Sequence, residues 1–70
     1  MKYLIVIERT ATGFSAYCPD VPGCIATGAT REETEREMSD ALTFHVEGLR
    51  LEGVKRPSPH TAAGYVEIAV

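Results

Sequence analysis

The stretch Thr27-Gly28-Ala29-Thr30-Arg31-Glu32-Glu33 marks the point where the chain changes from β structure to helix. The Thr30 hydroxyl can accept a hydrogen bond from a free backbone N–H of the first turn, and Glu33 stands three residues later, which is the spacing of a capping box. Gly53 can end the same helix in the left-handed conformation. The sequence therefore predicts a helix of about 22 residues, from Arg31 to Glu52.

The apolar residues of this helix divide into two groups. At about 100° per residue, one stripe gathers the residues that would pack on a sheet. It consists of Thr34, Met38, Ala41, Leu42, His45 and Leu49. Phe44 and Leu51, seven residues apart, fall outside this stripe and share their side of the helix with Glu47. We therefore expect Phe44 and Leu51 to stay exposed in the monomer and to contact either another protein or a second copy of the chain.

Three β-like segments precede the helix and one follows it. They are Lys2–Glu8, Phe14–Cys18, Cys24–Thr27 and Tyr65–Val70. A polar segment that ends in glycine, residues 9–13, predicts a hairpin between the first two strands. The turn formers of residues 19–23 separate the second strand from the third. The predicted order of elements is β-β-β-α-β.

A helical crossover returns the last strand to the side of the first strand and parallel to it. The expected fold is α+β, with a four-stranded mixed sheet and one helix on one face. The face that the helix leaves open would carry one of two apolar sets, either Leu4, Val6 and Tyr17 or Tyr3, Ile5, Ile7, Phe14 and Ala16. Exposed apolar patches mark binding surfaces, so we expect the protein to dock onto another protein.

The length and charge of the chain limit its function. Seventy residues make a single domain, residues 1–70. A chain of this size buries only about 60% of its unfolded surface, so we expect a homo-oligomer, a dimer or a tetramer. Ten acidic against seven basic residues give a net charge of −3, which disfavours direct binding to nucleic acid. No apolar run reaches membrane-helix length and no signal peptide is apparent, so we expect no membrane association and a cytoplasmic location.

The residue types that carry chemistry do not form a recognisable catalytic pattern. Cys18 and Cys24 lack the C-x-x-C spacing of a redox pair and the further ligands of a zinc site. We interpret them as small buried apolar residues, with an adventitious disulfide as the alternative. His45 lies on the packing stripe, and His60 lies in a proline-rich connection that we expect to be solvated. We expect no enzyme activity, no catalytic residue, no cofactor and no metal site.

Three motifs in a fixed order resemble one known family. They are Tyr17-Cys18-Pro19-Asp20-Val21-Pro22-Gly23-Cys24, then residues 27–33, then Arg56-Pro57-Ser58-Pro59. Together they resemble the HicB-like antitoxin family of toxin–antitoxin systems, from Tyr3 to Val70. The resemblance implies a partial ribonuclease-H-like fold, which agrees with the predicted order of elements. Because the chain ends at Val70, it resembles the short form of the family, without the C-terminal DNA-binding domain that many members carry.

The resemblance also implies a function. The chain would bind and neutralise a small basic HicA-type RNA-cleaving toxin by occluding the active face of that toxin. The expected contact residues are Asp20, Pro22 and Gly23 in the turn, and Phe44, Glu47 and Leu51 on the helix. A purely structural role for the turn and a dimer seam on the helix remain alternatives. Two other functions also remain open: an orphan oligomeric protein that binds a small ligand, and a metal-dependent nuclease, which would need several converging carboxylates.

Overall fold

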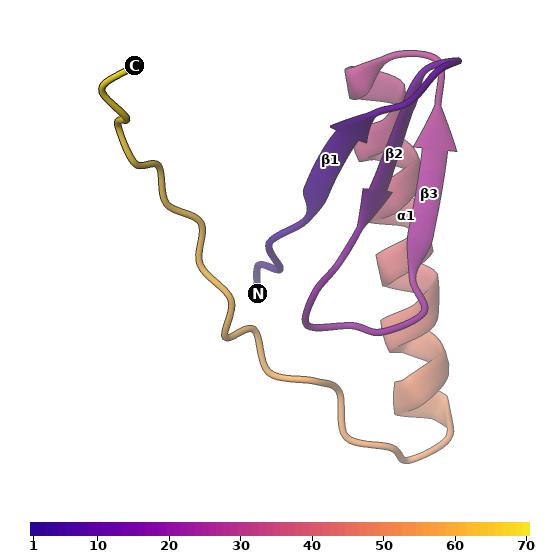
Figure 1. Cartoon of the computed structure of the whole chain (residues 1–70). Helices are drawn as coiled ribbons and strands as arrows, with labels where there is room; N and C mark the ends of the chain where they lie inside the picture. The colour runs from indigo at the N-terminus through magenta and orange to yellow at the C-terminus, as the bar shows by residue number, and fades with distance from the viewer.

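The computed structural model describes all 70 residues and shows a small sheet followed by one long helix (Figure 1). The elements are β1 (Val6–Arg9), β2 (Phe14–Tyr17), β3 (Ile25–Gly28) and α1 (Arg31–Leu51). The strands form an antiparallel sheet in the order β1-β2-β3, and α1 lies against one face of it. The α+β class is confirmed. No helix of the structure combines the length and the apolarity that crossing a membrane requires.

Both ends of α1 follow the sequence prediction. The Glu33 N–H donates to the Thr30 side-chain oxygen at 3.1 Å, so Thr30 is the N-cap. At the other end Gly53 adopts a φ of 72°. The Gly53 N–H donates to the Arg50 carbonyl at 3.1 Å and the Val54 N–H to the Leu49 carbonyl at 2.9 Å. These two bonds form a Schellman motif, in which a glycine with positive φ satisfies the last carbonyl groups of a helix.

The predicted hairpin between the first two strands is also present. The Thr10 N–H donates to the Gly13 carbonyl at 2.8 Å, and the Gly13 N–H donates to the Thr10 hydroxyl oxygen at 3.1 Å. The paired part of the first strand is shorter than predicted, because pairing begins where Val6 faces Tyr17. Beyond Tyr17 the chain leaves the sheet, so the N-terminal segment, residues 1–5, has no strand beside it.

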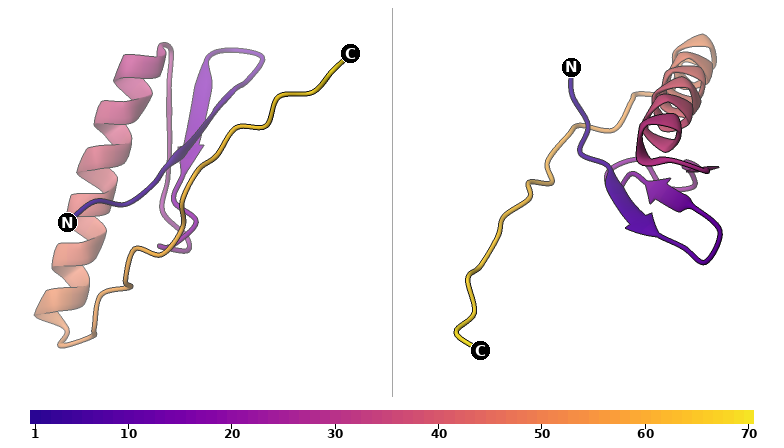
Figure 2. Two further views of the ribbon diagram at one scale, coloured as in Figure 1. Left: turned by 90° about the vertical axis from the view of Figure 1, so that its left-hand side faces the viewer. Right: turned by 90° about the horizontal axis from the view of Figure 1, so that it is seen from above.

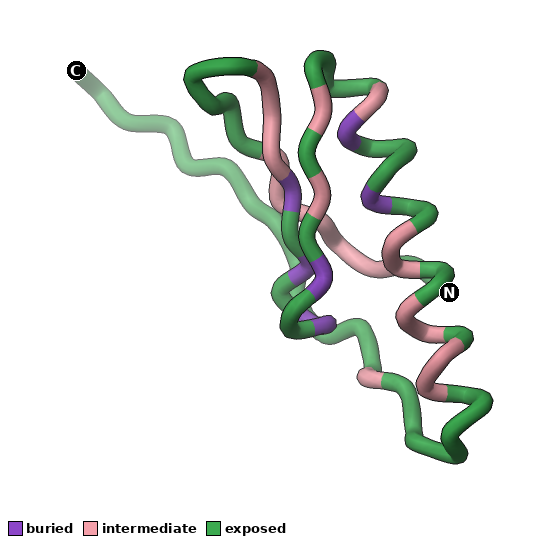
Figure 3. The backbone as a smooth tube through the Cα atoms, turned by 90° about the vertical axis from the view of Figure 1, so that its right-hand side faces the viewer, coloured by how far each residue is buried: buried purple, intermediate pink, exposed green.

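The structure decides which face of the sheet the helix covers. The core contains Ala16, Cys18, Val21, Cys24 and Met38, with Tyr3, Ile5 and Ile7 packed against it. The helix therefore covers the Tyr3, Ile5, Ile7 and Ala16 face. The opposite, outer face carries Val6, Tyr17 and Ile25, which face one another across the three strands. Only seven of the 70 residues are buried, and those on the helix lie in its N-terminal half (Figure 3).

The fourth strand does not form within the chain, and the prediction of a four-stranded mixed sheet is wrong for the single chain. Residues 65–70 are extended and exposed, and they run away from the body (Figures 1 and 2). The radius of gyration is 14.0 Å, whereas a compact chain of this length would have about 11 Å. The physical reason is that the chain is held near the sheet only as far as Thr61 and makes no turn after it.

Candidate functional site

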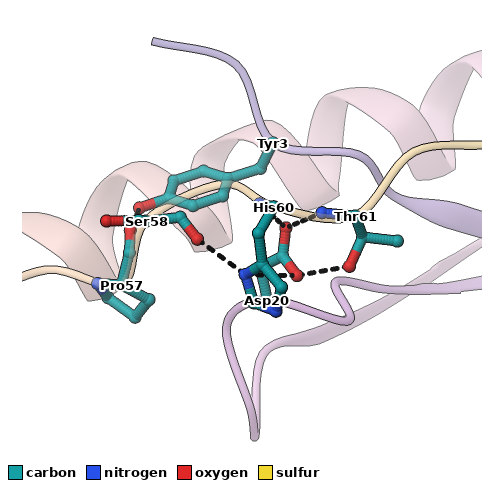
Figure 4. Close-up of polar contacts among 6 residues, drawn as sticks. All are labelled: Tyr3, Asp20, Pro57, Ser58, His60 and Thr61. Carbon is teal, nitrogen blue, oxygen red and sulfur yellow. Dashed lines mark hydrogen bonds and ion pairs between the residues drawn. The ribbon is translucent and has the colours of Figure 1, made fainter.

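Asp20 holds the segment that follows the helix against the body of the protein (Figure 4). It lies in the loop between β2 and β3, and its Oδ2 accepts hydrogen bonds from the backbone N–H groups of His60 at 2.9 Å and Thr61 at 3.0 Å. Its Oδ1 accepts a further bond from the Thr61 hydroxyl. Nearby, the Tyr3 hydroxyl donates to the Pro57 carbonyl at 2.6 Å. Three distant parts of the chain thus meet at one point.

These bonds stabilise the charged form of the Asp20 carboxylate. The Thr61 hydroxyl is the main cause that lowers the pKa of Asp20; burial opposes it, and the backbone N–H groups of His60 and Thr61 add to the lowering. The His60 ring Nδ1 lies 3.2 Å from Oδ1 and 2.9 Å from the Ser58 carbonyl oxygen, although the ring itself is exposed. We expected Asp20 to contact a partner; here the residue is 4% exposed and its carboxylate binds its own chain.

The other two predicted turn residues lie differently. Pro22 and Gly23 are both exposed at the tip of the β2–β3 loop, while their neighbour Val21 is buried in the core. Gly23 has a φ of 83°, which a residue with a side chain rarely adopts. Asp20 therefore fixes the base of this loop from inside, and Pro22 and Gly23 form the accessible part.

The predicted contact residues on α1 form an exposed surface, which we call the helix surface: Phe44, Glu47 and Leu51. Phe44 is 83% exposed and Leu51 is 73% exposed, as the sequence predicted. Glu47 accepts a hydrogen bond from Arg50 Nε at 3.1 Å. This bond is the main cause that lowers the pKa of Glu47 and raises that of Arg50. In water such an exposed ion pair contributes little to stability.

A groove of about 460 Å³ lies between the N-terminal segment and α1. Its lining residues are Met1, Tyr3, Ile5, Glu35, Ser39, Leu42, Thr43, Val46, Glu47 and Arg56. The apolar part combines Tyr3 and Ile5 on one wall with Leu42 and Val46 on the other. The groove exists because residues 1–5 extend past the end of β2 with no further strand beside them.

Both cysteines lie in the core of the protein. Cys18 and Cys24 are free and buried, as expected, and burial raises the pKa of the Cys24 thiol, with a smaller contribution from Cys18. No three His, Cys, Asp or Glu side chains lie together in a way that could hold a metal ion. The arrangement offers surfaces for binding: the helix surface, the groove and the outer face of the sheet.

Sequence reasoning missed the residues that bind Asp20. Thr61 is 41 positions away from Asp20, and no periodic or local pattern connects residues at that separation. The groove was also missed, although Leu42 was correctly placed on the packing stripe. Its one sequence signal is Val46, an apolar residue beside that stripe, four positions after Leu42.

Comparison with known proteins identifies relatives. Residues 3–68 match the model of a family described as the HicB-like antitoxin of the bacterial toxin–antitoxin system. An uncharacterised 14.9 kDa protein of Haemophilus phage HP1 is 33% identical over 66 residues, which are 94% of this chain and 50% of that protein. The UPF0150 protein Ta0767 of Thermoplasma acidophilum is 29% identical over 58 residues, 81% of this chain and 84% of its own.

Solved structures agree with the sequence comparisons. A chain of the HicA3 and HicB3 toxin–antitoxin complex superposes with a TM-score of 0.72 at 37% identity, over 86% of this chain and 70% of that one. The antitoxin HicB3 alone gives a TM-score of 0.70 at 38% identity, over 81% of this chain and 42% of its own. The chain thus spans half the length of the phage protein and less than half of that HicB3 chain. Since the family match covers almost all of its residues, the chain belongs to the HicB-like antitoxin family of bacterial toxin–antitoxin systems.

Proposed function

We propose that this protein is a non-enzymatic antitoxin that binds a small basic HicA-type RNA-cleaving toxin in the cytoplasm and neutralises it by covering its active face. The observation that carries the proposal is the likeness to a chain of the HicA3 and HicB3 complex, at 37% identity over 86% of this chain. A HicB-type chain of similar fold is thus found together with a HicA-type partner. The surfaces described above supply the contacts for such a partner.

The helix surface is the first of these contacts. Phe44 and Leu51 are two turns apart on α1, about 10 Å along the axis, and both side chains are free of contacts that would bury them. Exposed aromatic and aliphatic residues that become buried at the centre of an interface supply most of its binding energy. Phe44 is therefore the anchor, and Leu51 extends the apolar contact toward the end of the helix.

Acidic residues share the side of α1 that carries this apolar pair. Those on the same side of α1 are Glu33, Glu37, Asp40 and Glu47. Negative charge around an apolar centre attracts a basic protein and speeds its encounter with the surface. Part of the Glu47 charge is already balanced by Arg50, so a basic toxin residue would compete with Arg50 for this carboxylate. We propose Pro22 and Gly23, at the exposed loop tip, as a second contact, which Asp20 supports from within the loop.

The test is inhibition of a HicA-type toxin by the purified protein. We expect the chain to bind the toxin and to stop its RNA cleavage, and we expect Phe44→Asp to weaken binding at least tenfold, because a buried charge would replace the apolar anchor. Leu51→Asp should act in the same direction. Thr12→Asp is the control for the added charge and should leave the affinity unchanged, since Thr12 is exposed in the hairpin between β1 and β2, outside the helix surface, the groove and the outer face of the sheet.

Two results would contradict the proposal. One is continued RNA cleavage at full occupancy of the complex, and the other is an unchanged affinity in Phe44→Asp. The alternative of a metal-dependent nuclease has no support in the structure, because no group of carboxylates converges on a metal-sized site. The alternative of a small-ligand protein would use the groove between residues 1–5 and α1.

A further inference from the structure

Residues Tyr65–Val70 have the pattern of a strand but no partner within the chain. Val66, Ile68 and Val70 alternate with Tyr65, Glu67 and Ala69, so a strand here would have one wholly apolar side. All six residues are exposed. An extended apolar segment with a single charge and no proline is strongly disposed to add to another sheet. This segment, which we call the C-terminal strand segment, needs an edge to bind to.

The free edge of β1 fits this requirement. The order β1-β2-β3 leaves β1 without a neighbour on one side. The helix packs mainly over β3 and least over β1, so the inner face is uncovered on the β1 side (Figure 1). The groove between Tyr3, Ile5, Leu42 and Val46 lies beside residues 1–5, which lead into β1. A strand that pairs with β1 and continues along residues 1–5 would place one row of its side chains in this groove.

We propose that the C-terminal strand segment of one copy binds the free edge of β1 in a second copy, and that the second copy returns the same contact. The apolar row Val66, Ile68 and Val70 fills the groove of the partner, while Glu67 points to solvent on the other side. Each chain then has a four-stranded sheet, in which the fourth strand comes from its partner. The exchange is reciprocal, so it closes as a two-fold dimer.

The place where Asp20 binds Thr61 favours pairing of the C-terminal strand segment with a second copy over pairing with its own chain. The bonds from Asp20 hold the chain at Thr61, and only Ala62, Ala63 and Gly64 separate this point from the strand segment. These residues run straight on, without a turn, and the segment that follows diverges from β1 in Figure 1 and in the right-hand view of Figure 2. The segment thus leaves its own body at a fixed place and is available to another one.

The composition of the core favours a second copy as the occupant. Only seven residues are buried in the single chain, and a chain of this size, whose own core is small, gains stability from additional apolar burial. A second copy supplies both a strand and a sheet edge. The C-terminal strand segment and the free edge of β1 in each chain therefore both gain a partner. A toxin in the groove would leave the apolar strand segment of this chain exposed.

The first test measures the mass of the full-length protein in solution by light scattering or sedimentation. We expect a dimer at micromolar concentration, and a monomer for the double variant Val66→Asp/Ile68→Asp. Glu67→Gln is the control on the same segment and should remain dimeric, because Glu67 lies on the opposite side. Circular dichroism at low temperature checks that each variant keeps its helix, since these side chains are exposed in the single chain. The double variant should melt at a lower temperature than Glu67→Gln, because it lacks the burial that the second copy supplies.

The second test locates the strand segment. Two differently tagged forms are mixed, one carrying Leu4→Cys on the outer side of the N-terminal segment and the other Glu67→Cys. We expect a disulfide between the two forms under mild oxidation, and none when Glu32→Cys at the start of α1 replaces Leu4→Cys. Cys18 and Cys24 are buried and do not interfere. Folding back within one chain would give no bond between the two forms.

Three outcomes would overturn this proposal: a monomeric wild-type protein, a dimer that survives Val66→Asp/Ile68→Asp, or no disulfide between the two forms. A double variant that stays dimeric but loses toxin affinity would assign the segment to the toxin instead. None of the dimer measurements contains toxin, and toxin inhibition is measured separately with Phe44→Asp. Failure of the strand exchange and failure of the antitoxin function can therefore be distinguished.

Discussion

The carboxylate of Asp20 accepts hydrogen bonds from both the backbone N–H and the hydroxyl of Thr61, 41 residues further along the chain. Thr61 is the last residue of the chain that forms a hydrogen bond with the rest of the protein. Its contact with Asp20 connects the loop between β2 and β3 to the exit of the C-terminal strand segment. A substitution of Asp20 should therefore affect both the β2–β3 loop and the position from which the C-terminal strand segment leaves the body.

The lowered pKa of Asp20 predicts the pH dependence of this anchor. A carboxyl whose pKa is lower in the folded state contributes stability above its unfolded value of about 3.9, and this contribution is lost as the pH falls through the lower, folded value. We expect the Thr61 amide to stay protected from hydrogen exchange down to about pH 4 and to open below it. Nuclear magnetic resonance titration measures this, and Asp20→Asn should remove the pH dependence.

Replacing glycine by alanine should have opposite effects on the free energy of unfolding at Gly28 and at Gly48. A Cβ at Gly28 would lie 2.6 Å from the Thr34 hydroxyl oxygen and 2.9 Å from the Thr34 nitrogen, where β3 meets the start of α1. Gly28→Ala should therefore lower the free energy of unfolding by about 1–3 kcal/mol. Gly48, inside α1, has nothing within 4 Å of such a Cβ, and Gly48→Ala should raise it by about 1 kcal/mol. Urea denaturation compares the two, and equal effects would contradict the assigned packing.

Met38 should be the most sensitive position of the helix. Its side chain is fully buried in a core of only five apolar residues. Met38→Ala should cost about 2–5 kcal/mol of unfolding free energy. Phe44→Ala, on the exposed side of the same helix, should change stability by less than about 0.5 kcal/mol. Thermal melts followed by circular dichroism measure the stability of both variants. A similar loss of stability in Met38→Ala and Phe44→Ala would contradict the burial of Met38 and the exposure of Phe44.

The thiol of Cys24 should be unreactive in the folded protein. Burial raises its pKa, and the thiolate is the form that reacts. We expect negligible modification by an aromatic disulfide reagent near pH 8 in buffer and modification of both cysteines in denaturant. Rapid modification of the folded protein would show that the β2–β3 loop opens readily, since Cys18 and Cys24 flank this loop.

The local features of the fold could be read from the sequence because each is decided by neighbours along the chain. Thr30 and Glu33 define the start of α1, and Gly53 defines its end, through bonds that span no more than five residues. The exposure of Phe44 and Leu51 follows from the helical period alone. The family could be recognised for a similar reason, because its motifs combine such local signals in a fixed order.

The order of the first four elements, the ends of the helix and the exposure of Phe44 and Leu51 thus follow from the amino-acid sequence alone. Three features depend on the tertiary structure: which face of the sheet the helix covers, the burial of Asp20, and the absence of a partner strand for residues 65–70 within the chain. Hydrophobic alternation predicts that Tyr65–Val70 will pair as a strand, but it carries no information about which edge the strand meets. That choice depends on where Asp20 and Thr61 hold the chain, which is a contact between residues far apart in the sequence.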